Sequence, residues 1–139
     1  MSIAGAKLSH LVQKDKIWDH GSMAEQARII FYLVHKAKAG GNIESLKKQC
    51  SVSCFERIEA EIASRETGRS MVIVPMIKEL AIIDVQPGKN NKPDRFCSLI
   101  KYHLKESFNG IETEDNSKEF ITEWCFIRQG EWWVLNDIK

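Results

Sequence analysis

The sequence predicts an α+β fold in which N-terminal helices pack on a curved, four-stranded antiparallel sheet. Two patterns along the chain carry this prediction. Up to Gly68, apolar residues recur at steps of three and four, which is typical of amphipathic helices. From Met71 onward the period becomes two, and turn residues divide the remainder into four segments, which is typical of strands. Helices followed by a meandering sheet form two layers around one core.

The length and composition predict one soluble globular domain. The chain has 139 residues, of which 43% are hydrophobic and 28% are charged. With 20 Lys and Arg against 19 Asp and Glu, the net charge is +1, which argues against a nucleic-acid partner because binding to phosphates needs a basic surface. No apolar run approaches the ~20 residues that span a bilayer. We expect a cytoplasmic protein, with residues 1–21 as an N-terminal arm or short helix and residues 22–139 as the domain.

The first long helix is predicted to begin at Ser22. Ser22 and Glu25 have the spacing of a capping box, in which each side chain accepts a hydrogen bond from the backbone of the other. An apolar stripe follows at three- and four-residue steps and consists of Met23, Ala27, Ile30, Phe31, Val34 and Ala37. Gly40-Gly41 ends the helix, because glycine readily adopts the left-handed conformation found just beyond a helix.

Two shorter helices are predicted next. Asn42 caps one that continues to about Gln49. Ser53 and Glu56 repeat the capping-box spacing at the start of the other, which Gly68 closes. The apolar stripe of this last helix is narrow, so we expect the helix on the outside of the domain.

Polar turns separate the four predicted strands. The strands cover residues 72–85, 95–108, 118–128 and 131–138. Pro75 has no N–H group to donate to a neighbour, which predicts a sheet edge, a bulge or a strand beginning for the first of them. The connections are the polar segments 87–93 and 109–117 and the tight turn at Gln129-Gly130.

The C-terminal strands carry a resemblance to a known family. The run Trp124-Cys125-Phe126-Ile127-Arg128, followed after a hairpin by Trp133-Val134-Leu135-Asn136-Asp137-Ile138, resembles the W-x-F-x-R … W-x-L-x-x-I ending of the Tim-forty-four-like domain. Lys14-Asp15-Lys16-Ile17-Trp18-Asp19 resembles the segment before the first long helix of that family, and the passages 31–37 and 42–46 resemble its next helical stretch. The mitochondrial import motor's membrane tether and bacterial relatives share this domain. The resemblance implies the cystatin-like cone of the nuclear transport factor two-like superfamily, in which helices pack on a curved four-stranded sheet.

The resemblance implies a non-enzymatic binding or scaffold domain without a cofactor. Members of the family recruit partner proteins near a membrane and associate with acidic phospholipid through N-terminal helices. Here Lys7, Lys14 and Lys16 are the candidate membrane contacts. We expect a protein partner or self-association, with peripheral placement at the inner membrane face, on the matrix side if the protein is mitochondrial. The anchoring segment usual upstream in bacterial members does not occur here, so we expect an excerpt of a longer protein or a soluble variant.

The concave side of such a sheet encloses a pocket if its side chains leave room. The candidate lining residues are Phe31, Val34, Phe55, Ile100, Tyr102, Trp124 and Phe126. They either fill the core or surround an apolar small ligand that the polar tips of Tyr102 and Trp124 orient. The alternative function is therefore a small-molecule-binding protein, or an isomerase or dehydratase that uses the interior of the cone.

An enzyme of this kind needs an Asp or a His–Asp pair as general base. The available groups are His35, His103, Asp84 and Asp137, and the pattern places no pair of them in one pocket. We therefore expect no catalytic residues.

Two residues near the last hairpin are candidates for contacts with partners. Trp132 and Trp133 are adjacent on a strand, so they point to opposite faces. The family pattern places Trp133 in the core and leaves Trp132 as an interface candidate, unless a helix or the N-terminal arm covers it. Arg128 either closes the mouth of the cone, binds Glu123 or an acidic ligand, or forms an ordinary surface ion pair.

The four cysteines show neither a disulfide framework nor a paired metal knuckle. Cys50 and Cys54 flank a predicted helix start, and Cys97 and Cys125 lie on different strands. We expect four buried free thiols in a reducing compartment, and no metal ion.

Overall fold

The computed structural model describes residues 3–40, 43–64, 71–108, 111–113 and 119–139. The helical elements are α1 (Ile3–Lys14), the 3-10 turn η1 (Lys16–Trp18), α2 (His20–Lys38), the 3-10 turn η2 (Ile43–Leu46) and α3 (Val52–Ala63). The strands are β1 (Met71–Gln86), β2 (Arg95–Phe108), β3 (Ile111–Thr113), β4 (Glu119–Gln129) and β5 (Trp132–Ile138). Three helices thus pack against an open antiparallel sheet, which confirms the predicted α+β class.

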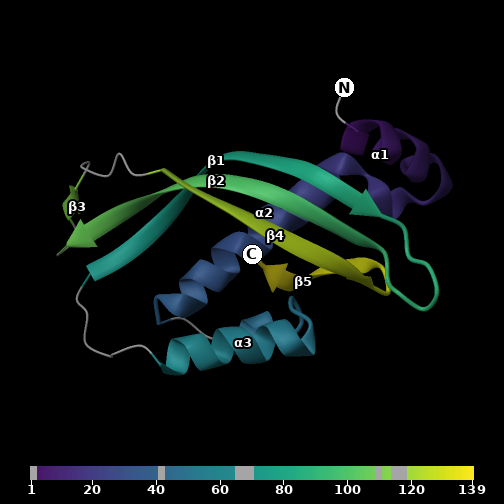
Figure 1. Cartoon of the computed structure of the whole chain (residues 1–139). Coiled ribbons are helices and arrows are strands. Elements are labelled where there is room, and N and C mark those ends of the chain that lie inside the picture. Colours follow the sequence, from purple (N-terminus) through teal and green to yellow (C-terminus); the bar gives the residue numbers. More distant parts are fainter. Residues whose placement is uncertain (1–2, 41–42, 65–70, 109–110, 114–118) are drawn as a thin grey trace.

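The sheet is antiparallel throughout, with the strand order β1-β2-β4-β5. Figure 1 shows α2 crossing one face of the long, curved strands, with α3 beside β5 and α1 near the end of β1. The short strand β3 pairs with the last residues of β2 and falls inside the segment that was predicted as a polar loop. The described helices therefore share one face of the sheet, and none of them covers the opposite face, which we call the outer face.

The start of α2 differs from the prediction. The helix begins at His20, and Asp19 is its N-cap, with Oδ2 accepting from the Ser22 N–H at 2.9 Å. The Ser22 hydroxyl donates to the same oxygen. Ser22 therefore supports the cap rather than forming it, because a carboxylate three residues upstream is an equally good or better cap.

The start of α3 is shifted in the same direction. The N-cap is Ser51, whose hydroxyl accepts from the Cys54 N–H, so Ser53 lies inside the first turn. The described part of α3 ends at Ala63, and the predicted stop at Gly68 lies outside the described residues. The end of α2 agrees with the prediction, since Gly40 has a φ of +103°, which favours glycine.

Each helix buries one apolar side against the sheet. The predicted stripe of α2 is fully confirmed: Met23, Ala27, Ile30, Phe31, Val34 and Ala37 are all buried. In α3 the buried residues are Cys54, Phe55 and Ile58. Leu8 of α1 is buried as well, and Leu11 and Val12 pack on the same core, so the N-terminal arm is a helix docked on the domain.

The two edge strands of the sheet have different neighbours. At the β5 edge, Leu135 donates its N–H to the Gln49 carbonyl and accepts from the Ser51 N–H, both at 2.8 Å, so the segment 49–51 runs beside the strand. The other edge is β1, which carries Pro75 as the sequence predicts. Along it, the Ile77 N–H donates to the hydroxyl of Tyr32 on α2.

Candidate functional site

The seven predicted lining residues lie between the helices and the sheet and pack against one another or their neighbours. The Phe31 ring is 5.1 Å from the rings of both Tyr102 and Trp124, measured between centroids. Phe126 stacks on Phe96 at 4.8 Å. Phe31, Val34, Ile100 and Phe126 have no exposed surface, Trp124 and Phe55 are buried, and Tyr102 is half-buried. Rings from β2 and β4 therefore pack against Phe31 of α2.

Two side chains of this cluster carry a polar group, the indole N–H of Trp124 and the phenol of Tyr102. The Trp124 indole N–H donates to the Thr122 hydroxyl at 3.1 Å. Burial raises the pKa of the Tyr102 phenol. The His35 ring joins the cluster on the helix side, 4.4 Å from Phe31 and nearly parallel to Trp124. The sequence did not place His35 among the lining residues, because it lies beside the apolar stripe of α2 rather than on it.

A surface groove lies at the β4–β5 hairpin, on the side where the N-terminal segment meets the sheet. Its volume is about 450 Å³. We call it the Trp132 groove, and its lining residues are Asp15, Lys16, Ile17, Ser22, Gln26, Arg128, Glu131, Trp132 and Trp133. The lining therefore comes from η1 and the residue before it, from the first turns of α2, and from the hairpin.

The two adjacent tryptophans have opposite environments, as predicted. Trp133 is 3% exposed, with its ring 5.1 Å from Trp18 and 4.8 Å from Phe96. Its indole N–H donates to the Ile17 carbonyl at 3.1 Å. Trp132 is 66% exposed. One tryptophan thus fixes the floor of the groove to the N-terminal segment, and the other stands at the groove with most of its surface in water.

Arg128 holds the walls of the groove together. One guanidinium nitrogen lies 2.6 Å from Asp15 Oδ2 and 3.2 Å from Asp94 Oδ2, and Nε donates to the Gly130 carbonyl at 2.7 Å. The hydrogen bond from Arg128, followed by that from the Ile17 N–H, lowers the pKa of Asp15. The hydrogen bond with Asp15 and, after it, the one with Asp94 raise the pKa of Arg128, while burial acts in the opposite direction. Arg128 therefore forms an ion-pair network.

The carboxylate that the sequence offered to Arg128 has another partner. Glu123 lies 2.8 Å from the Lys139 ammonium. The actual partners of Arg128 come from η1's N-cap, Asp15, and from the β1–β2 connection, Asp94. A second groove, of about 420 Å³, lies on the other side of Arg128 and is lined by residues 88–94, Arg128 and Gly130. None of the seven predicted lining residues borders either groove.

The four groups considered for general-base chemistry lie in four separate settings. His35 is in the aromatic cluster described above. His103 is 3.8 Å from Glu119, and Asp84 accepts from the Gln86 amide at 3.0 Å. Asp137 is paired with Arg57 of α3 at 3.1 Å. The structure thus brings no two of these four groups into hydrogen-bond contact with each other.

The three candidate membrane-contact lysines are exposed. Lys7 and Lys14 lie on α1 and Lys16 lies on η1. The apolar side of α1 faces the protein, because Leu8 is buried there. None of the helices among the described residues is long and apolar enough to cross a bilayer.

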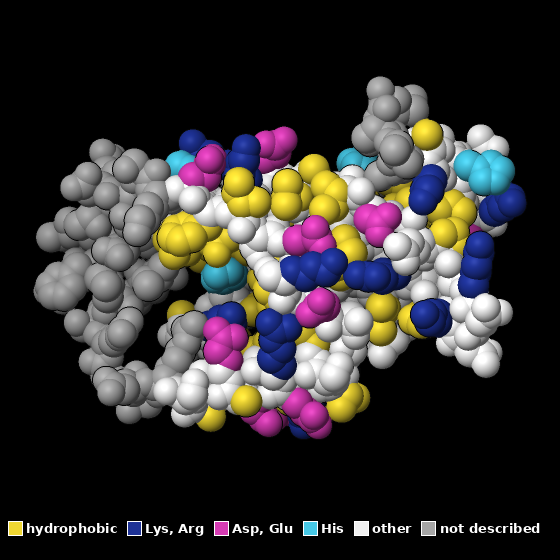
Figure 2. Space-filling view, in the orientation of Figure 1, with side chains coloured by type: hydrophobic (Ala, Val, Ile, Leu, Met, Phe, Trp, Pro, Cys, Tyr) yellow, Lys and Arg dark blue, Asp and Glu magenta, His cyan; other side chains and the backbone are white. Residues whose placement is uncertain are grey.

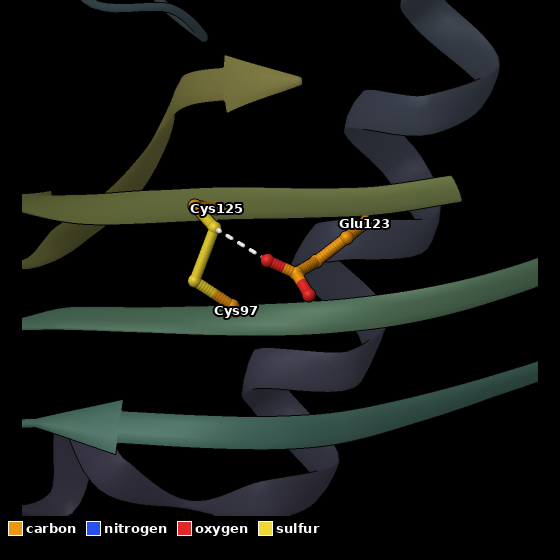
Figure 3. A group of neighbouring side chains, drawn as sticks. All are labelled: Cys97, Glu123 and Cys125. Atoms are coloured by element: carbon orange, nitrogen blue, oxygen red, sulfur yellow. Dashed lines mark hydrogen bonds between the residues drawn. A yellow bond between two sulfur atoms is a disulfide. The ribbon is translucent and has the colours of Figure 1, made fainter. Parts of the chain in front are cut away.

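The prediction of four free thiols is half wrong. Cys97 and Cys125 form a disulfide between β2 and β4, shown in Figure 3. The strand register explains the pairing, because Cys97 lies directly opposite Cys125. The sequence prediction missed this pair because the register between the two strands cannot be counted across the segment that connects them. The strands therefore carry a cross-link where two separate buried thiols were expected.

Cys50 and Cys54 agree with the prediction, since both are free and buried. Their thiols are hydrogen-bonded to each other, which raises the pKa of Cys50 and lowers the pKa of Cys54. Burial opposes the second shift, and the positive charges of Arg57 and Lys38 add to it.

Comparison with known proteins shows a likeness of fold. No protein-family model and no curated protein matches the sequence. Among solved structures, the intermembrane space region of the chloroplast protein ARC6 is similar, with a TM-score of 0.53, 13% identity, and coverage of 84% of this chain and 94% of that one. The putative transfer protein TraH from the Gram-positive conjugative plasmid pIP501 has a TM-score of 0.45 and 12% identity, covering 83% of this chain and 91% of its own. The chain thus shares its fold with the ARC6 region.

Proposed function

We propose that this chain is a non-enzymatic binding domain that docks a partner protein in the Trp132 groove. The observation that carries the proposal is the 66% exposure of Trp132 beside a groove of about 450 Å³. An indole in water costs free energy that a partner recovers by covering it, and tryptophan is enriched among residues that dominate binding energy.

The construction of the groove supports the same proposal. Trp133 and Ile17 give it an apolar floor, and Arg128, Asp15 and Glu131 place charges around it. An apolar centre with a polar rim is the usual composition of a protein interface. The ion pairs of Arg128 and the Trp133 hydrogen bond hold the parts of the groove in place before a partner arrives, which lowers the ordering cost of binding.

The packing inside the cone favours a function at the protein surface over ligand binding in an interior pocket. Among the residues that would line such a pocket, Phe31 is in ring contact with Tyr102 and Trp124 and has no exposed surface. A small-molecule or isomerase-type function would need those rings to separate.

The assignment to the Tim-forty-four-like family is part of the proposal, supported by the order of its motifs and by the shared fold class.

The outer face of the sheet is a less suitable docking surface. Figure 2 shows acidic and basic side chains distributed across this side of the molecule among the hydrophobic ones. Lys101 is 3.8 Å from Glu79, and His103 is 3.8 Å from Glu119. Charges that already have partners on the surface would have to be desolvated by a docking protein.

Comparative co-purification tests the proposal. Ile121 offers a matched control, because it is 60% exposed on the outer face of β4. Wild type, Trp132→Ala and Ile121→Ala are purified from native cells under identical conditions, and co-purifying proteins are quantified. We expect one protein to be retained by wild type and I121A and to be depleted at least tenfold with W132A, with equal unfolding midpoints for all three. Equal retention by W132A and wild type would refute the proposal.

A further inference from the structure

We propose that Cys97, Cys125 and Glu123 form a redox-gated metal site, which is closed in the disulfide form and binds a thiophilic divalent cation such as Zn²⁺ when the two cysteines are reduced. The site is on the outer face of the sheet and shares no residue with the Trp132 groove. It is independent of the proposed docking function.

The backbone places the three donor groups together. Cys97 and Cys125 are opposite residues on neighbouring antiparallel strands. Glu123 is two residues before Cys125 on β4, so its side chain emerges on the same face. Figure 3 shows the Glu123 carboxylate directed toward the sulfur atoms, on the side of the strands away from α2.

The distances suit a tetrahedral metal ion. The donor atoms of the three residues all lie within 4.8 Å of one another, and a carboxylate oxygen of Glu123 is 3.8 Å from Cys125 Sγ. Zn–S bonds of about 2.3 Å and Zn–O bonds of about 2.0–2.2 Å at a tetrahedral angle place sulfur and oxygen about 3.5–3.7 Å apart. Glu123 is therefore close to a ligating position, and side-chain rotation of the reduced cysteines opens space for the ion.

The surroundings stabilise the charge that the loaded site would carry. Two thiolates and one carboxylate around a divalent cation leave a net charge of −1. Arg95 lies 3.6 Å from Cys125 Sγ, and Lys139 lies 2.8 Å from a Glu123 oxygen. Cationic groups at these positions compensate the excess negative charge and orient the ligands, as groups outside the coordination sphere do in other metal sites.

The chemistry balances in two steps. A cellular thiol reductant transfers two electrons by thiol–disulfide exchange, so the Cys97–Cys125 bond breaks, two protein thiols form, and the reductant leaves as its own disulfide. The metal ion then replaces the two thiol protons, which are released to solvent. With three protein ligands, the fourth position remains for water or another donor.

Cobalt titration tests the proposal. Co²⁺ serves as the probe, because thiolate ligation produces an ultraviolet charge-transfer band and tetrahedral geometry produces visible bands. The titration uses the full chain with C50S and C54S, which removes the other two thiols. One sample is reduced with a phosphine that is then removed under anaerobic conditions, and the other is kept oxidised. We expect one Co²⁺ per reduced chain, displaceable by Zn²⁺, and no thiolate band in the oxidised sample.

Single substitutions in that background assign the ligands. Cys125→Ser is expected to abolish the charge-transfer band, and Glu123→Gln to weaken Co²⁺ affinity at least about tenfold. Glu119→Gln is the matched control, because Glu119 lies on the same strand and on the same face as Glu123. Circular dichroism verifies that each variant is folded. Absence of a thiolate band in the reduced protein, or equal weakening by E119Q and E123Q, would overturn the proposal.

Discussion

The carboxylate of Asp15 and the guanidinium of Arg128 are 2.6 Å apart, although 113 positions separate them in the chain. The contact joins the N-cap of η1 to the end of β4. Asp94 binds the same guanidinium from the β1–β2 connection. Three segments that are distant in sequence are thereby fixed around one cation. The Trp132 groove lies between two of them, the N-terminal segment and the β4–β5 hairpin.

This ion pair predicts a specific pH dependence of stability. Hydrogen bonds from Arg128 and the Ile17 N–H hold the folded-state pKa of Asp15 below the unfolded value of about 3.9. Its contribution is therefore present above that value and is lost as the pH falls through the lower, folded-state pKa. Urea denaturation should show Asp15→Asn to be less stable than wild type at neutral pH, with the two proteins converging in acid. A difference that stays constant with pH would contradict this cause.

The packed interior predicts a large cost for removing its central ring. Phe31→Ala should lower the free energy of unfolding by about 3–5 kcal/mol, because the truncation leaves a cavity among rings that contact it directly. Ile29→Ala on the same helix is the control, since Ile29 is 43% exposed and should cost within about 0.5 kcal/mol. Urea denaturation measures both. A small loss for F31A, comparable with that of I29A, would instead indicate an open interior.

The cysteine pairing predicts a definite alkylation pattern. Under denaturing, non-reducing conditions, iodoacetamide should modify Cys50 and Cys54, and it should reach Cys97 and Cys125 only after reduction. Peptide mass mapping distinguishes the two pairs. Modification of Cys97 without reductant in the oxidised protein would show that the cross-link does not form.

The exposed lysines predict a weak, salt-sensitive attraction to acidic phospholipid. Lys7, Lys14 and Lys16 contribute about 1 kcal/mol each near an anionic surface, and the packed side of α1 leaves little apolar surface to insert. Wild type should sediment with phosphatidylserine vesicles at low salt, and K7E/K14E/K16E should not. If wild type does not sediment with these vesicles, the expectation of membrane contact through these lysines is wrong.

The sequence predicts those features that depend on local periodicity. The buried stripe of α2 and the opposite environments of Trp132 and Trp133 follow from helical and strand spacing, and both are confirmed. The edge position of β1 is one of the three settings that Pro75 predicts. The first residue of a helix is harder to predict from sequence, because several residues near each start can serve as the N-cap. Asp19 and Ser51 are the caps, where Ser22 and Ser53 have the same chemistry at similar positions.

The features that depend on distant contacts were not predictable from spacing. The partners of Arg128 come from two other segments, and the Cys97–Cys125 bond depends on the register between β2 and β4. Strand register is set by the whole hydrophobic pattern and the connecting segment, not by the two residues that meet. The groove consequently appears only when the N-terminal segment and the hairpin are brought together.

Photo-crosslinking in native cells tests the docking claim most directly. A photoreactive amino acid replaces Glu131, an exposed residue that lines the groove beside Trp132, in one variant and the exposed Ile121 in another. We predict a covalent adduct with one protein from position 131 and none with that protein from position 121. An adduct that forms from position 121 and not from position 131 would contradict the docking claim.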